Sequence, residues 1–162
     1  MGYQMLQRGS VHIATPAEAP AVARLLCEFR DWWGNAEPSE ELMLASVRRI
    51  MEAGDGEYLL GATTTGGEPA GVAQIRFRWS VWKTAEDCWL EDLYVREAAR
   101  GAGLGRALVD AAVARARARG CRRIELDVNE DNDAARGLYA ACGFTFEPKP
   151  PGRTLFAGRA LA

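Results

Sequence analysis

The chain has 162 residues, of which 48% are hydrophobic and 26% charged, and its formal net charge is −2 at pH 7. These values are ordinary for a globular protein and predict one domain, residues 1–162, with a substantial core. The slight negative charge argues against a general nucleic-acid-binding surface. Because no apolar stretch approaches the ~20 residues of a membrane span and residues 1–10 lack a signal-peptide core, we expect a cytoplasmic protein without membrane contact.

Strand and helix signals alternate in the first half of the chain. One helix begins at Thr15-Pro16 and carries apolar side chains at helical spacing, and a second opens at Pro38-Ser39-Glu40 and ends at Gly54. A hairpin turn is predicted at Gly66-Gly67. Alternating apolar residues predict strands over residues 11–14, 58–65, 70–80 and 88–95.

The second half continues with helix 103–119, strand 123–128, helix 132–142 and two closing strands near 144–147 and 154–160. This order predicts an α+β fold with a mixed sheet. Strand 88–95, helix 103–119 and strand 123–128 form a β-loop-α-β unit, in which the two strands run parallel. The loop of this unit therefore lies at the carboxyl ends of its strands, where open sheets bind ligands.

That loop is rich in glycine and opens a helix. Glycines let the backbone approach an anion closely, and the first N–H groups of the helix carry its partial positive charge. Flanking arginines can neutralise the remaining phosphate charge, so the loop is a candidate diphosphate site. A dinucleotide fingerprint would need a glycine at Arg106, and a P-loop would need Gly-Lys-Ser/Thr, so both motifs are excluded. The loop reads Arg100, Gly101, Ala102, Gly103, Leu104, Gly105 and Arg106.

Two motifs together resemble the GNAT superfamily of acetyl-CoA-dependent N-acetyltransferases. The first is R-x-x-G-x-G, at Arg100, Gly103 and Gly105. The second is N-x-x-A-x-x-L-Y-x-x-x-G-F, which begins at Asn132 and contains Tyr139. The resemblance covers about a third of the chain, residues 89–144, and the N-terminal half agrees only in its order of elements.

The resemblance implies a GNAT-like fold: a twisted, mostly antiparallel sheet of about six to seven strands, splayed between the fourth and fifth, with about four helices. It also implies direct acetyl transfer, in a ternary complex, from acetyl-CoA to a primary amine of a small molecule or peptide, with coenzyme A as product. The implied cofactor-binding residues are the whole loop Arg100 to Arg106, Asn132, and the strand residues Leu93, Tyr94 and Val95. No metal is implied, and His12 is expected to be structural. A non-catalytic acyl-CoA sensor is the alternative function.

An amine must lose a proton before it attacks a thioester, so a carboxylate is needed near the cleft. Glu91 is the first candidate for this base. On a regular strand Glu91 and Asp92 point to opposite faces, and only a bulge brings both into one site. Asp127 and Glu125 are reserve candidates.

A phenol near the sulfur can protonate the leaving thiolate, and the resemblance gives that role to Tyr139. Cys142 as an acylated nucleophile is the rival mechanism, but no histidine is available to activate it.

Acceptor binding is expected near the first two helices, at Asp31, Trp32 and Trp33, together with Asp92. Tryptophan rings beside an acid suit a cationic amine, although they equally suit a packed corner or a homodimer contact. The segment around Glu91 and Asp92 looks like the corresponding strand of diamine and polyamine acetyltransferases. The arginines near residues 115–123 are interpreted as a solvated helix end rather than an RNA site, and the four cysteines as reduced structural thiols.

Overall fold

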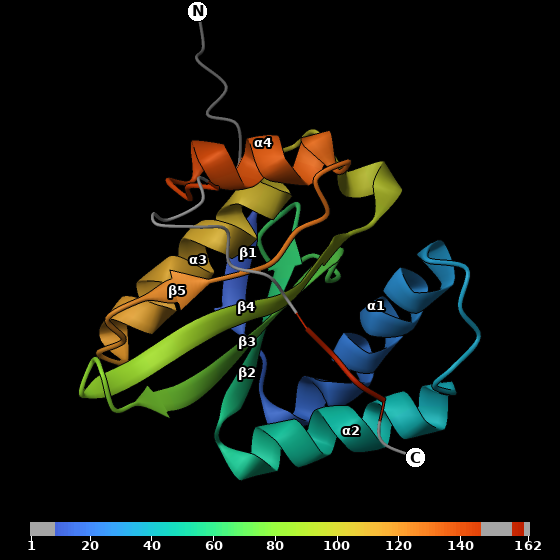
Figure 1. Cartoon of the computed structure of the whole chain (residues 1–162). Helices are drawn as coiled ribbons and strands as arrows, with labels where there is room; N and C mark the ends of the chain where they lie inside the picture. Colours follow the sequence, from blue (N-terminus) through green and yellow to red (C-terminus); the bar gives the residue numbers. More distant parts are fainter. Residues whose placement is uncertain (1–8, 147–156, 161–162) are drawn as a thin grey trace, which may run out of the picture.

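The computed structural model describes residues 9–146 and 157–160 of the chain. Within them, five strands form one sheet in the order β1-β2-β3-β4-β5 (Figure 1). Neighbouring strands are antiparallel, except that β4 and β5 run parallel. The expected mixed sheet is therefore confirmed. The strands are β1 (Ser10–Ile13), β2 (Gly56–Ala62), β3 (Gly71–Ser80), β4 (Ala85–Val95) and β5 (Ile124–Glu125).

Helices cover both faces of the sheet (Figure 1). One apolar core joins α3 and part of α4 to side chains such as Ile75 and Leu90, and the other joins α1 and α2 to side chains such as Tyr58 and Val72. Because successive strand residues point to opposite faces, the central strands β2, β3 and β4 contribute to both cores. None of the described helices is long and apolar enough to cross a membrane. The helices are α1 (Ala19–Trp32), α2 (Glu40–Ala53), α3 (Leu104–Ala118) and α4 (Asp133–Ala141).

The helix ends follow local sequence signals. The Ser39 hydroxyl accepts a hydrogen bond from the Leu42 N–H at the start of α2, and Gly54 ends that helix with φ +72°. Asn132 caps α4 in the same way, because its side-chain oxygen accepts from the Ala135 N–H at 3.1 Å. At the start of the first helical segment, residues Pro16–Glu18 form a short 3₁₀ turn before α1 begins.

A bulge interrupts β4 at Glu91. Asp92 lies opposite Gln74 and Leu90 lies opposite Ile75, so Glu91 is an extra residue without a cross-strand partner. The alternation of faces shifts at this point, because Leu90 and Leu93 both join the α3 core. The bulge that would bring Glu91 and Asp92 into one site is therefore present.

The splay expected between the fourth and fifth strands is present. β5 pairs with β4 only at Cys88 and Trp89, although β4 continues to Val95. The predicted strand 123–128 is therefore wrong after residue 125, because its backbone leaves β4 and pairs with no other strand of the described residues. Residues 144–146 and 157–160 also form no strand, and the rest of the two predicted closing strands lies outside the described residues.

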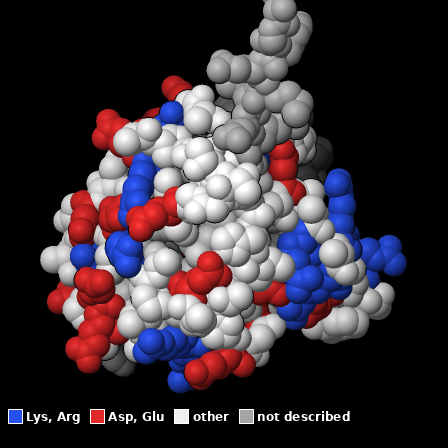
Figure 2. All heavy atoms as spheres, turned by 180° about the vertical axis from the view of Figure 1, so that it is seen from behind, with Lys and Arg blue, Asp and Glu red and all other residues white. Residues whose placement is uncertain are grey.

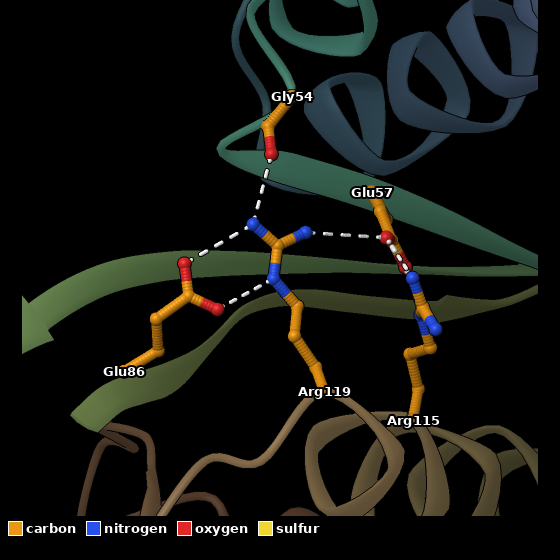
Figure 3. A network of polar contacts seen from close by, with 5 residues as sticks. All are labelled: Gly54, Glu57, Glu86, Arg115 and Arg119. Carbon is orange, nitrogen blue, oxygen red and sulfur yellow. Dashed lines mark hydrogen bonds and ion pairs between the residues drawn. The ribbon is translucent and has the colours of Figure 1, made fainter.

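An ion-pair network joins the C-terminal end of α3 to the sheet (Figure 3). Arg119 Nε donates to Glu86 at 2.6 Å, and a second nitrogen of the same guanidinium donates to the Gly54 carbonyl at 3.1 Å. Arg115 binds Glu57 through two hydrogen bonds of 2.7 Å each. The Arg119 guanidinium also lies over the Phe77 ring, 4.0 Å from its centroid. The interpretation of this arginine run as a solvated face is therefore wrong for these two residues.

Other arginines of the run remain at the surface. Arg117 and Arg122 are exposed and form no ion pair with any other described residue. Seen from behind, acidic and basic side chains are interspersed over most of the face, and the largest basic group lies on the side of the β3–β4 hairpin (Figure 2). All four cysteines are free thiols, in agreement with the sequence-based expectation.

The network leads to a stability prediction. In Arg119→Met, Glu86 loses its hydrogen-bonding partner, and we expect the free energy of unfolding at pH 7 to fall by about 1–3 kcal/mol. The matched control Arg117→Met changes an exposed arginine on the same helix and is expected to stay within about 0.5 kcal/mol of the parent protein. Urea unfolding measures both, and equal midpoints for the two variants would contradict a stabilising role for the network.

The same pair makes this difference depend on pH. The Arg119 hydrogen bond lowers the pKa of Glu86 below its ordinary value of 4.5. A lowered carboxyl pKa contributes stability that is present above the unfolded pKa and is lost as the pH falls through the folded pKa. We therefore expect the cost of Arg119→Met to shrink once the pH drops below about 4.5.

Candidate active site

A cleft of about 1020 Å³ opens where β4 and β5 diverge. It runs from the glycine-rich loop, past the end of β4 and the start of α4, to the facing sides of α1 and α2. One continuous space therefore connects the candidate diphosphate site with the expected acceptor region.

The glycine-rich loop forms the first end of this cleft. Gly101 and Gly103 have φ values of +78° and +82°, which side chains with a Cβ rarely adopt. Gly103 caps α3, so the free N–H groups of the first helical turn face the loop. A Cβ at Gly105 would lie 3.3 Å from Leu138, which leaves little room for a side chain there. This geometry fits a diphosphate bound by backbone N–H groups.

The loop arginines lie at the border of the cleft. Arg100 Nε donates to the Val95 carbonyl at 3.0 Å, and its guanidinium lies 5.9 Å from the Trp32 ring centroid. Arg106 lines the cleft and forms a 3.6 Å ion pair with Asp110. Every predicted loop residue except Ala102 lines the cleft.

The end of β4 offers free backbone groups to the same space. Leu93, Tyr94 and Val95 all line the cleft, and β5 has already left the edge of β4 four residues before Leu93. Their N–H and C=O groups on that edge are thus not paired with β5. An extended ligand can pair with such an edge in the manner of an added strand.

Three carboxylates meet farther along the cleft. Glu91, Asp92 and Asp127 all line it, and none forms an ion pair within residues 9–146 and 157–160. Burial, together with the neighbouring charges of Glu91 and Asp127, raises the pKa of Asp92 to about 6. The bulge in β4 explains why Glu91 and Asp92, although adjacent in the chain, both reach this site. Glu125, a reserve candidate, does not line the cleft and instead lies 3.2 Å from Arg123.

Tyr139 lies beside the carboxylates. It is 8% exposed, lines the cleft from α4, and packs against Phe144 with ring centroids 5.8 Å apart. Burial raises the pKa of its phenol, and the nearby Asp127 and Asp92 add to this effect. The phenol therefore keeps its proton at neutral pH. Asn132 also lines the cleft, at the start of the same helix.

Trp32 and Trp33 line the opposite side, while Asp31 does not. The two indoles meet edge to face at 4.8 Å, and Phe29 stacks on Tyr94 at 5.4 Å. Asp31 turns outward and pairs with Arg30 at 2.6 Å, so its charge is already neutralised. The structure therefore does not bring Asp31 into the cleft beside Trp32 and Trp33.

Comparison with known proteins identifies the family. The acetyltransferase (GNAT) family profile matches residues 21–144. The chain belongs to the GNAT acetyltransferase family. An aminoglycoside N(6')-acetyltransferase type 1 from Stenotrophomonas maltophilia is 33% identical and aligns over 83% of this chain and 85% of its own. A thialysine N-epsilon-acetyltransferase from Bos taurus is 34% identical over 48% of each chain.

A crystal structure of an Arthrobacter acetyltransferase shares the fold of this GNAT protein. Its TM-score is 0.82 at 32% sequence identity, and the alignment covers 94% of this chain and 96% of that one. The protein is thus a GNAT-type N-acetyltransferase, as its two motifs indicated.

Sequence reasoning missed several residues of the GNAT cleft. Tyr58 and Gln74 line it from β2 and β3, and α2 contributes a side at helical spacing, formed by Met43, Ser46, Val47 and Ile50. A detectable signal was the polar Gln74 between apolar neighbours in a buried strand.

Asp92 leads to a second stability prediction. Its folded pKa of about 6 lies above the ordinary value of 3.8, so the folded protein loses stability as the pH rises from about 3.8 to about 6. We expect Asp92→Asn to be more stable than the parent at pH 8, with a gain that shrinks toward pH 4. Urea unfolding at several pH values measures this, and Glu52→Gln, which changes an exposed carboxylate outside the cleft, is the control. A pH-independent difference for Asp92→Asn would contradict the raised pKa.

Proposed function

We propose that this GNAT enzyme transfers an acetyl group from acetyl-CoA to a primary amine of a small cationic molecule, by direct attack within a ternary complex. The observation that supports this most strongly is the charge distribution of the single cleft. One end holds the glycine-rich loop and two arginines, and the other holds three carboxylates without cationic partners among the described residues. An anionic donor and a cationic acceptor therefore have complementary ends to bind.

The donor end fits acetyl-CoA, which supplies the acetyl group as a thioester. The α3 N-terminus and the loop from Arg100 to Arg106 would hold the diphosphate. The free edge of β4 at Leu93 and Val95 would hydrogen-bond the pantetheine arm and orient the thioester, and Asn132 lies along the same path.

The acceptor end supplies the proton acceptor. Glu91 and Asp92 would take the proton from the bound ammonium, and the raised pKa makes Asp92 a better base than an ordinary carboxylate. The neutral nitrogen then forms its bond to the acetyl carbon and releases its second proton to solvent as the carbon–sulfur bond breaks. Tyr139, protonated at neutral pH, would give its proton to the departing sulfur.

An aminoglycoside is the first acceptor to test. The Stenotrophomonas maltophilia relative is named for acetylation of an aminoglycoside amine, and it aligns over most of both chains. Polycationic amines suit three carboxylates in one cleft, and the Trp32 and Trp33 rings offer faces for a cation.

The first test is amine-dependent release of free thiol from acetyl-CoA, with aminoglycosides, polyamines, amino acids and short peptides as acceptors. We expect turnover of a cationic small molecule, and in Tyr139→Phe a fall in kcat of about 10²-fold at an unchanged Kd for acetyl-CoA, because only protonation of the sulfur is lost. Cys142→Ala is the control for an acyl-enzyme route and should keep the parent rate. Loss of all activity in that control would overturn direct transfer.

A second test addresses the donor site. Gly103→Ala places a side chain at φ +82°, and we expect the Kd for coenzyme A to rise by roughly tenfold as the loop distorts. Gly66→Ala is a matched control, because Gly66 has φ +73° in a turn that does not line the cleft. Calorimetry on both variants decides the matter: equal Kd values would argue against diphosphate binding at the loop.

A further inference from the structure

Three polar side chains form a row across the sheet below the acceptor end of the cleft. Tyr58 on β2 lies opposite Gln74 on β3, and Gln74 lies opposite Asp92 on β4. All three line the cleft. Because directly opposed residues point to the same face, their side chains stand side by side on the floor of the cleft.

Tyr58 and Gln74 are deeply buried but have no described partner. Tyr58 is 1% exposed and Gln74 is 6% exposed. Within residues 9–146 and 157–160, neither side chain makes a hydrogen bond, and neither has a polar atom that is both sealed from solvent and unpaired. Both residues line the cleft, so their hydroxyl and amide groups lie where a ligand can meet them. Buried polar groups are nearly always hydrogen-bonded, so a ligand in the cleft would supply the partners for this pair.

The surroundings make the pair selective. Val47 and Ile50 on α2 and Leu26 on α1 present apolar side chains to the same end of the cleft. Ser46, also on the α2 side, already donates its hydroxyl to the Leu42 carbonyl at 2.9 Å. Tyr58 and Gln74 thus keep free hydrogen-bonding capacity beside Asp92.

We infer that Tyr58 and Gln74 determine acceptor specificity by hydrogen-bonding a hydroxyl or amino substituent that the acceptor carries near its reacting amine. An amide and a phenol each donate and accept, so they match a group that does both. This inference rests on the proposed function, in which the reacting amine sits at Glu91 and Asp92.

The strand spacing predicts where that substituent lies. Neighbouring strands are about 4.8 Å apart, so Gln74 reaches a group about 5 Å from the amine held at Asp92. A 1,3-amino alcohol has this separation, as do the 6-amine and 4-hydroxyl of a 6-aminohexose. The acceptor class is therefore a primary amine with a hydrogen-bonding group three carbons away.

The test uses acceptor pairs that differ only in this group. One pair is 3-aminopropanol and n-butylamine, which have equal charge and similar length, and the other is a methyl 6-amino-6-deoxyglucoside and its 4-deoxy analogue. Each pair is assayed for kcat/KM, and for Kd by calorimetry in the presence of coenzyme A, which needs no turnover. The proteins are the parent, Gln74→Leu, Tyr58→Phe and the control Thr63→Val, which removes an exposed hydroxyl outside the cleft, each with its melting temperature recorded.

We expect the parent to prefer the hydroxylated member by about 10- to 100-fold, as one or two hydrogen bonds allow. In Gln74→Leu, the ratio of kcat/KM between the hydroxylated and the other member of each pair should fall close to one, through a change in KM and with the Kd for coenzyme A unchanged. In Tyr58→Phe, the same ratio should fall only in part. Thr63→Val should keep the parent ratio.

Two results are distinguishable. Turnover without preference in the parent, or an unchanged ratio in a folded Gln74→Leu, overturns the inference while leaving the proposed function intact. Absence of turnover with a preference still measured by calorimetry overturns the proposed function and supports the inference.

Discussion

The unpaired residue Glu91 in β4 is the constraint on which the site depends. Without it, strand alternation would send Glu91 and Asp92 to opposite faces of the sheet. The bulge brings both carboxylates to the cleft and returns Leu93 to the α3 core. Close to this point β5 leaves β4, so a free strand edge and a carboxylate pair arise together. The same departure from regular pairing thus provides space, backbone hydrogen-bonding groups and charge.

The two ends of α3 have linked roles. Its N-terminus, after Gly103, presents unpaired N–H groups to the cleft. Its C-terminal end is held to β2 and β4 by Arg115 and Arg119, which bind Glu57 and Glu86. Cations at a helix C-terminus also interact favourably with the helix dipole, so these arginines stabilise the helix end in addition to forming their ion pairs. Because the helix is anchored to the strands that shape the cleft, the orientation of its anion-binding end follows from the packing of its other end.

The electrostatics of the cleft oppose the stability of the fold. Asp92, half-buried among other carboxylates, is held at a raised pKa near 6 without a cation among the described residues. A protein optimised only for stability would pair or remove such a group. Tyr58 and Gln74 present the same contrast, since core positions of this burial are usually apolar. Groups of this kind concentrate at sites that bind a ligand with complementary charge and hydrogen bonds.

Local signals in the sequence determined a large part of this protein. Features that depend only on nearby residues were recognisable from the sequence. They are the glycine-rich loop, the helix starts at Ser39 and Asn132, the order of elements and the motif around Tyr139. Only the tertiary structure decided that Glu91 and Asp92 enter the same cleft and that Tyr58 and Gln74 line it with them. It also decided the ion pairs: Asp31 turns away to Arg30, and Arg115 and Arg119 bind acidic partners. These outcomes depend on strand register and on contacts between residues far apart in the chain. A pattern of neighbouring residues does not reveal strand register or long-range contacts, because both depend on packing across the whole sheet.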